Sequence, residues 1–211
     1  MTRKTLLTAA LVLASMAAGA EAQSLQMVLR PDSKLTLDGS SNIHEWACKS
    51  SAFVATVDVD TGFITGAFAK LLNPIGSVAV QIPVKTLKCG HGKMDDNMYK
   101  ALKAEEFPEI RYALKSYTVD REHATADAFT AKTIGDLTVS GQTIRVEIPI
   151  TVERSATGSV RGQGTVNLLM TDFGIKPPTA LLGTLRTKNE IKIGFDVLLD
   201  KGTVVALGMD Q

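Results

Sequence analysis

The stretch Gly135-Asp136-Leu137-Thr138-Val139-Ser140-Gly141-Gln142-Thr143-Ile144-Arg145-Val146-Glu147-Ile148-Pro149-Ile150 contains two runs of alternating apolar and polar residues, separated by a turn. In the second run four aliphatic residues share one side of an extended chain, and polar residues occupy most of the other side. This period of two is typical of a strand with one face in water. Ser140-Gly141-Gln142 has the composition of a hairpin turn. The stretch therefore predicts an antiparallel β-hairpin.

Similar runs occur along most of the chain. We predict strands at residues 34–38, 42–48, 52–59, 63–70, 77–84, 109–119, 123–130, 132–139, 143–152, 164–170 and 190–199. Most are separated by glycine-containing links that are too short for helical crossovers, which excludes a parallel α/β fold. A sheet of this size in one domain usually closes into a barrel or packs as a sandwich. The sequence thus predicts an all-β antiparallel fold. If the sheet closes into a barrel, its interior could hold a ligand.

One amphipathic helix is predicted at residues 93–105, between the early and the late strands. Met94, Met98, Ala101 and Leu102 form an apolar stripe at helical spacing. Such a stripe usually packs against a sheet, and methionine side chains also adapt to irregular apolar surfaces. We expect this helix to cap the sheet, either as ordinary core packing or as the lid of a binding cavity.

The first 22 residues have the features of a cleavable export signal. Arg3 and Lys4 precede a short apolar run, and Ala20-Glu21-Ala22 fits the small-x-small rule for cleavage. The apolar run is too short to span a membrane. We expect a signal peptide at residues 1–22, a mature domain at residues 23–211 and a periplasmic or secreted location.

The expected mature chain carries no excess of charge. Removing residues 1–22 leaves 189 residues (211 minus 22), with 21 basic and 21 acidic side chains out of 23 and 22 in the full sequence. Scattered and balanced charges provide no basic surface for a nucleic acid. No apolar segment after the leader approaches membrane-spanning length. We therefore expect neither a nucleic-acid partner nor a membrane-spanning protein, and we leave a homodimer open.

Sequence signatures of catalysis are lacking. The chain has no Gly-x-Ser-x-Gly elbow, no His-Glu-x-x-His zinc helix and no phosphate-binding loop. Asp172-Phe173-Gly174 spells a kinase tripeptide, but the other kinase elements are missing and the segment indicates a turn. His123 has no evident catalytic partner. The sequence therefore predicts a protein that is not an enzyme and that needs no cofactor.

The two cysteines, Cys48 and Cys89, allow two interpretations. Two cysteines in an exported chain usually form a disulfide. Closing a loop of about 40 residues would stabilise the fold by roughly 3–4 kcal/mol in the chain-entropy model. Alternatively, His44 and His91 could join the two thiolates in a zinc, copper or redox-linked site. We prefer the disulfide and keep the metal- or redox-linked protein as the alternative.

Three segments stand out by their order and spacing. They are Phe63-Ile64-Thr65-Gly66-Ala67-Phe68, residues 95–112, which end in Phe107-Pro108-Glu109-Ile110-Arg111-Tyr112, and the hairpin at 135–150. Together they resemble an early strand, the helix with the following strand start, and a hairpin of the YceI-like family of secreted or periplasmic, lipocalin-like barrels associated with polyisoprenoid lipid binding. The resemblance extends over residues 34–199, whereas the segments around the two cysteines depart from the commoner family pattern.

The resemblance implies a lipocalin-like antiparallel β-barrel with one amphipathic capping helix, which binds, transports or sequesters a polyisoprenoid lipid or an isoprenoid quinone. A barrel of about eight strands can hold one small ligand or be filled by its own side chains. A filled barrel would instead favour a structural or partner-binding envelope protein. Candidate lipid-binding residues of the cavity wall are Phe53, Phe63, Phe68, Met98, Phe107, Tyr112, Val146, Ile148, Met170, Phe173 and Phe195.

Overall fold

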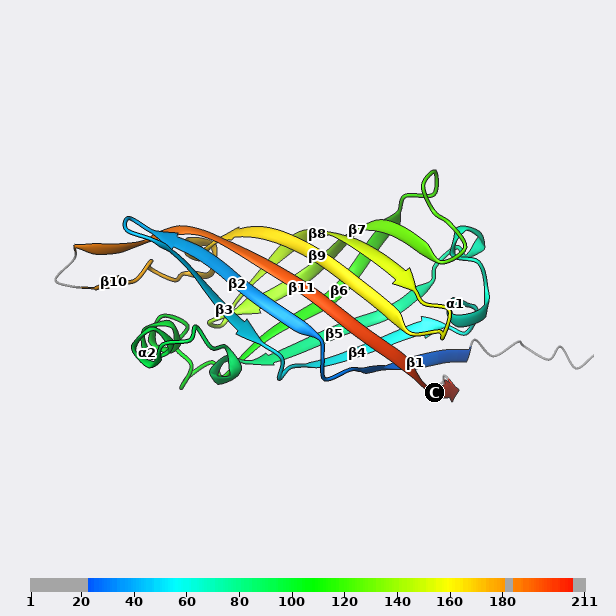
Figure 1. Ribbon diagram of the computed structural model, residues 1–211, viewed down its shortest axis with the longest axis horizontal. Coiled ribbons are helices and arrows are strands. Elements are labelled where there is room, and N and C mark those ends of the chain that lie inside the picture. The colour runs from blue at the N-terminus through cyan, green and yellow to red at the C-terminus, as the bar shows by residue number, and fades with distance from the viewer. Residues whose placement is uncertain (1–22, 181–183, 207–211) are drawn as a thin grey trace, which may run out of the picture.

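The computed structural model describes residues 23–180 and 184–206 and shows an antiparallel β-barrel (Figure 1). Within the described residues, eight strands follow one another around the barrel, and pairing of the last with the first closes it. In this spatial order they are β1 (Gln23–Leu29), β4 (Val54–Asp60), β5 (Ile75–Pro83), β6 (Glu109–Val119), β7 (Ala128–Val139), β8 (Gln142–Arg154), β9 (Val160–Leu169) and β11 (Leu185–Ala206). The predicted fold class is confirmed.

Strand β11 is the longest of the described elements and pairs with three long strands, two of the barrel ring and β2. Residues 190–199 pair with β9, residues 187–196 pair on the other side with β2 (Lys34–Ser41), and residues 199–206 pair with β1. Thus β1 and β2 lie end to end along the same strand. β2 forms a hairpin with β3 (Glu45–Ser50), which continues the wall toward one end of the barrel, and the short β10 (Thr179–Ala180) pairs with the start of β11 there.

The hairpin predicted from residues 135–150 is the β7–β8 pair. Its loop consists of Ser140 and Gly141, and both have positive φ angles, 49° and 77°. Two left-handed residues form the primed turn whose twist matches that of the strands, which is why glycine is favoured here. The hydroxyl of Ser140 donates a hydrogen bond to the carbonyl of Leu102, 2.9 Å away. The turn therefore contacts the residue that ends the capping helix.

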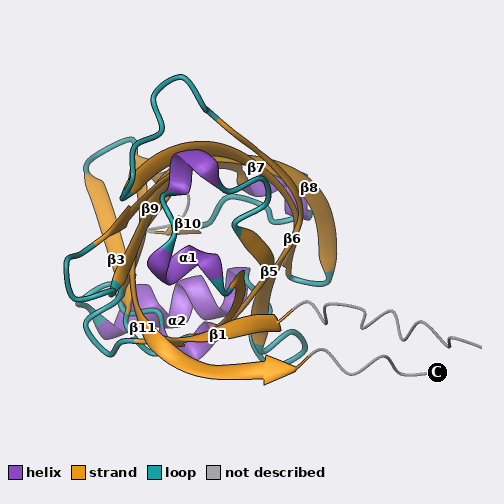
Figure 2. Cartoon of the chain, turned by 90° about the vertical axis from the view of Figure 1, so that its right-hand side faces the viewer, coloured by secondary structure: helices purple, strands orange, loops and turns teal. Residues whose placement is uncertain are grey.

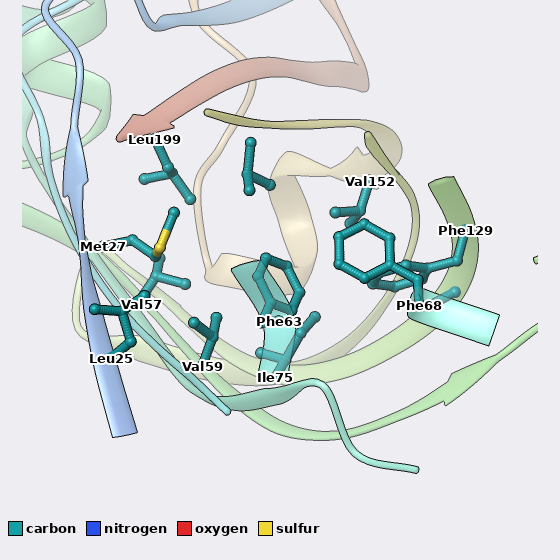
Figure 3. Packing of buried hydrophobic residues seen from close by; sticks show 12 residues of the cluster. Leu25, Met27, Val57, Val59, Phe63, Phe68, Ile75, Phe129, Val152 and Leu199 are labelled. Carbon is teal, nitrogen blue, oxygen red and sulfur yellow. The ribbon is translucent and has the colours of Figure 1, made fainter. Parts of the chain in front are cut away.

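Side chains alternate between the interior and the solvent as the period of two predicts. In β7, Ala131 and Thr133 are buried, whereas the intervening Lys132 and Ile134 are exposed. Inward side chains of all eight strands consequently meet inside the barrel. The buried side chains at one end of the barrel, near α1, form the larger of the two apolar clusters (Figure 3).

Helix α2 (Gly92–Ala101) covers the opposite end of the barrel (Figure 1). It ends earlier than the predicted 93–105, because the chain turns at Lys103, which has a left-handed φ of 51°. The predicted capping position is confirmed: Met94, Met98, Ala101 and Leu102 all face the barrel interior. Two short 3-10 helices directly follow strands at this end: η2 (Val84–Thr86) follows β5 and η3 (Met170–Phe173) follows β9.

The prediction of a strand at residues 63–70 is wrong. This segment forms a helical turn, α1 (Gly62–Thr65), and a 3-10 turn, η1 (Phe68–Lys70), and Figure 2 shows α1 within the ring of strands. Phe63 and Phe68 are five residues apart, so a strand would send their rings to opposite faces. The two turns bury both rings, 4.7 Å apart, and Phe129 packs edge-on against Phe68. These three rings, the aromatic plug, close this end of the barrel.

Other strand boundaries also differ from the prediction. The strands predicted at 123–130 and 132–139 are one strand, β7, because residues 120–127 form a loop in which the carboxylate of Asp120 binds the ring of His123. Strands β1 and β10 were not predicted, and β9 begins at Val160 rather than at residue 164. Among the described residues, no helix has the length and apolar character that a membrane crossing requires. The predicted signal peptide lies outside the described residues.

The side chain of Arg154, at the end of β8, holds the aromatic plug in place. Its guanidinium donates hydrogen bonds to the carbonyls of Phe63 (2.7 Å), Gly66 (2.8 Å) and Ala126 (3.0 Å). It also lies over the ring of Phe68, 4.6 Å from the ring centre. The Arg154 side chain is only 9% exposed, although its ion-pair partner Asp127 is 62% exposed. One buried cation thus satisfies carbonyls that the turns leave without strand partners.

Replacing Arg154 with Leu should destabilise the protein by about 3 kcal/mol, because the carbonyls of Phe63 and Gly66 lose their buried charged donor. Urea unfolding measures this loss. Arg145→Leu is the matched control, since Arg145 is exposed and pairs with Asp136 at the surface. Its cost should stay within about 0.5–1 kcal/mol. Equal losses in the two variants would contradict the assigned role of Arg154.

Candidate binding cavity

The barrel encloses a cavity of about 950 Å³. Side chains from the barrel strands, from β2 and β3, and from α2 line it, and most of them are aliphatic or aromatic. The interior is therefore not filled by side chains, and of the two arrangements open to an eight-stranded barrel this chain adopts the one with space for a ligand. A concave, mostly apolar enclosure with few polar groups is typical of small-molecule sites.

Eight of the eleven residues predicted for the cavity wall line the cavity. They are Phe53, Phe63, Met98, Tyr112, Ile148, Met170, Phe173 and Phe195. Phe63 belongs to the aromatic plug and forms the floor at the α1 end. Met98 comes from α2, at the opposite end. The predicted residues therefore surround the space from several sides, and lipid contact by them stays a prediction.

The other three predicted wall residues do not line the cavity. Phe68 is 1% exposed and lies within the aromatic plug, between Phe63 and Phe129. Phe107 follows α2, and its ring lies against Gly141 at the β7–β8 turn. Val146 is buried opposite Gly135, at the place where the ring of Tyr112 lies against the wall. Inward direction alone does not decide which side chains reach the open space.

Three aromatic rings of the wall lie on glycines of a neighbouring strand. Trp46 covers Gly39, Tyr112 covers Gly135 and Phe195 covers Gly164, so closely that a Cβ atom at any of these glycines would overlap the ring. Each ring uses the space of the missing side chain and lies along the wall instead of extending into the cavity. These glycines and Trp46 were not predicted. Glycine inside a strand, which often marks a close approach, was the available signal.

Polar side chains on the cavity lining are concentrated at the α2 end, where β10 and the start of β11 also lie. They are Ser41, His44, His91, Lys93, Asn97, Thr179 and Thr187. His44, His91 and Lys93 are also exposed to solvent, so this end of the cavity meets water. Two further hydroxyls, those of Tyr112 and Thr133, lie deeper in the barrel. The lining thus changes from polar at the α2 end to apolar at the aromatic plug.

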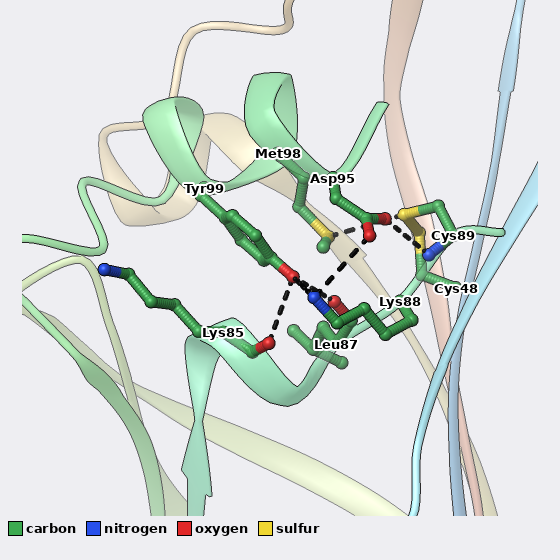
Figure 4. Close-up of a disulfide and its surroundings, with 8 residues drawn as sticks. All are labelled: Cys48, Lys85, Leu87, Lys88, Cys89, Asp95, Met98 and Tyr99. Carbon is green, nitrogen blue, oxygen red and sulfur yellow. Dashed lines mark hydrogen bonds and ion pairs between the residues drawn. A yellow bond between two sulfur atoms is a disulfide. The ribbon is translucent and has the colours of Figure 1, made fainter. Parts of the chain in front are cut away.

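Cys48 and Cys89 form the predicted disulfide, with Cα atoms 3.9 Å apart (Figure 4). The bond joins β3 to the segment that leads into α2. The backbone N–H of Cys89 donates a hydrogen bond to the buried carboxylate of Asp95 in α2, 2.7 Å away. The hydroxyl of Tyr99, one turn later, donates to the carbonyl of Leu87 at 2.7 Å. Covalent and polar contacts therefore fix the start of the helix to the barrel wall.

The disulfide uses both thiolates that the alternative metal site would require. Within the described residues, no cluster of three or more His, Cys, Asp or Glu side chains is arranged to hold a metal ion. His123, at the other end of the barrel, is exposed and pairs with Asp120. The arrangement thus offers an enclosed apolar space as its main chemical feature.

Comparison with known proteins agrees with this geometry. The family model for the YceI-like domain matches residues 34–199. Among solved structures, BcnA of Burkholderia cenocepacia has a TM-score of 0.64 and 17% identity, covering 81% of this chain and 99% of its own. A polyisoprenoid binding domain from Saccharophagus degradans, implicated in plant cell wall breakdown, has a TM-score of 0.59 and 13% identity, covering 86% and 99%.

The YCEI protein of Campylobacter jejuni has a TM-score of 0.56 and 15% identity, covering 74% of this chain and 84% of its own. No curated protein sequence matches the chain. At these identities the solved structures establish a shared fold.

Loss of the disulfide should lower the free energy of unfolding by about 3–4 kcal/mol, since the bond closes a loop between residues 41 positions apart. Urea unfolding of the double variant Cys48→Ala/Cys89→Ala and of the reduced wild-type protein should give similar losses. Equal stability of the oxidised and reduced wild-type protein would refute the structural role of the bond.

Gly135→Ala should destabilise the protein by about 1–3 kcal/mol, because the added methyl group forces the Tyr112 ring away from the wall. Gly162→Ala is the matched control: Gly162 also lines the cavity, but a Cβ there would meet no atom within 4 Å. That change should be neutral or stabilising by up to about 1 kcal/mol. Thermal and urea unfolding distinguish the two variants, and equal effects would disprove the close packing at Gly135.

Proposed function

The chain belongs to the YceI-like family, and we propose that it is a non-enzymatic carrier or sequestrant of a polyisoprenoid lipid or an isoprenoid quinone. The observation that carries this proposal is the enclosed, mostly apolar cavity of about 950 Å³. Burial of an apolar chain contributes on the order of 0.8 kcal/mol per methylene-sized unit and needs few directional contacts. An isoprenoid tail suits such a wall.

The related structures support the same class of ligand. One of them is described as a polyisoprenoid binding domain, and its fold matches over most of this chain. In this chain, apolar side chains from both ends of the barrel and from α2 line one continuous space. We infer that the tail lies inside the barrel and that selection among tails depends mainly on length and shape.

We further propose that the protein acts in the periplasm or outside the cell after removal of residues 1–22. The small-x-small motif before Gln23 supports this, and so does the disulfide, since such bonds persist in oxidising compartments. The alternative, a structural or partner-binding role, would require a barrel filled by its own side chains. The open interior gives that alternative no support.

Protein purified from its native host should contain a stoichiometric isoprenoid species in its organic extract, detected by mass spectrometry. Ile148→Trp should weaken the binding of long isoprenoids more than that of short ones, because Ile148 lines the cavity and a larger ring shortens the space. Competition with a fluorescent isoprenoid measures both affinities.

Ile134→Trp serves as the control, since Ile134 lies on the exposed face of β7 and should leave both affinities unchanged. Lipid-free extracts, together with no uptake of isoprenoids or quinones by the purified protein, would sink the carrier proposal.

A further inference from the structure

Two hydroxyl groups lie on the inner wall midway along the barrel, those of Tyr112 on β6 and Thr133 on β7. Two residues earlier on β6, Ile110 packs with the apolar cluster at the α2 end. Five residues later on the same strand, Tyr117 packs with the cluster at the α1 end. The hydroxyl pair therefore faces the central part of the cavity, away from both ends.

The hydroxyl of Thr133 has a good hydrogen-bond partner. Thr133 is buried and donates its proton to the carbonyl of Ile148, 2.8 Å away. The hydroxyl of Tyr112 lies 3.5 Å from the Thr133 oxygen, whereas O–H···O hydrogen bonds are usually about 2.7–2.8 Å long. The Tyr112 proton therefore has only a weak acceptor in the protein.

The hydroxyls of the other two tyrosines of the chain, in contrast to that of Tyr112, have close hydrogen-bond partners. Tyr117 donates to the carbonyl of Ile75 and accepts from its N–H, both at 2.9 Å. Tyr99 donates to the carbonyl of Leu87 at 2.7 Å. Neither residue lines the cavity. Only the tyrosine that faces the cavity lacks a strong partner among the described residues.

Ring packing does not require a hydroxyl at this position. Phe195 covers Gly164 just as Tyr112 covers Gly135, and both rings line the cavity. A phenylalanine at 112 would pack in the same way and would leave no weakly bonded hydroxyl in the wall. The extra oxygen therefore points to a partner that enters the cavity.

We propose that the Tyr112 hydroxyl donates a hydrogen bond to a neutral oxygen acceptor of the bound ligand, so that the cavity selects isoprenoids carrying a carbonyl, such as a quinone ring, over hydrocarbons. This inference rests on the function proposed above and names the ligand's polar group and its place. Thr133 keeps its bond to Ile148 and leaves the Tyr112 proton free for the ligand.

The surroundings favour a neutral acceptor over an anionic one. Among the described lining residues the only lysine is Lys93, at the α2 end, and no arginine faces the cavity. An anionic group in the middle of the barrel would be buried without a countercharge, at high cost. Burial also raises the pKa of the Tyr112 phenol, so the group stays a protonated donor.

Two probes with the same short isoprenoid tail test the proposal: one carries a benzoquinone ring, whose carbonyls accept hydrogen bonds, and the other a plain benzene ring, which has no such acceptor. Tyr112→Phe should weaken binding of the quinone on the order of tenfold and leave binding of the benzene probe unchanged. Competition with a fluorescent isoprenoid gives both affinities. Infrared spectra should show that the carbonyl stretching frequency of the bound quinone is lowered in the wild-type protein. The frequency should not be lowered in Tyr112→Phe.

Tyr117→Phe is the matched control, because it removes a hydroxyl that is satisfied by Ile75 and lies outside the cavity lining. It should change neither affinity and should keep the lowered carbonyl frequency. Equal effects of Tyr112→Phe on both probes, or none on either, would overturn the inference while leaving the carrier function standing. If wild-type protein binds the fluorescent isoprenoid but not the quinone probe, this inference fails alone. If it binds neither the fluorescent isoprenoid nor either probe, the carrier function fails and this inference fails with it.

Discussion

Closure of the sheet through β11 is the constraint on which the rest of the structure depends. This strand pairs with β9 on one side and with β2 and then β1 on the other, so the ring has no free edge between β9 and β1. Closure removes the unpaired N–H and C=O groups that an open edge would expose. It also fixes the interior volume, because every strand must send alternate side chains into the same space.

The two ends of that space are closed by different chemistry. At the α1 end, apolar rings pack together and one buried guanidinium binds the carbonyls of the turns that carry them. At the α2 end, a disulfide, a hydrogen bond from the Cys89 N–H to Asp95 and one from Tyr99 to the carbonyl of Leu87 fix a helix whose inner face is apolar. Polar and solvent-exposed side chains line the cavity only at this second end among the described residues. The cavity lining is therefore more polar and better hydrated at the α2 end than at the α1 end.

The open interior depends on where the large side chains lie. Trp46, Tyr112 and Phe195 would occupy much of a narrow barrel if they extended toward its axis. Glycines on the neighbouring strands let the rings lie along the wall, so aromatic surface is available to a ligand without filling the space. The same placement brings the weakly bonded hydroxyl of Tyr112 to the inner surface.

Local patterns in the sequence determined the sheet, its main hairpin, the capping helix and the pairing of the cysteines. Strand period, turn composition and helical spacing act over a few residues, and Cys48 and Cys89 are the only cysteines present. Local patterns could not reveal that residues 63–70 turn inward. That arrangement depends on partners such as Phe129 and Arg154, which are distant in sequence. Nor could alternation distinguish Ile148, which reaches the cavity, from Val146, which does not. Both side chains point inward from β8. Only the tertiary structure places the ring of Tyr112 over Gly135, which is opposite Val146, and leaves Ile148 in contact with the cavity.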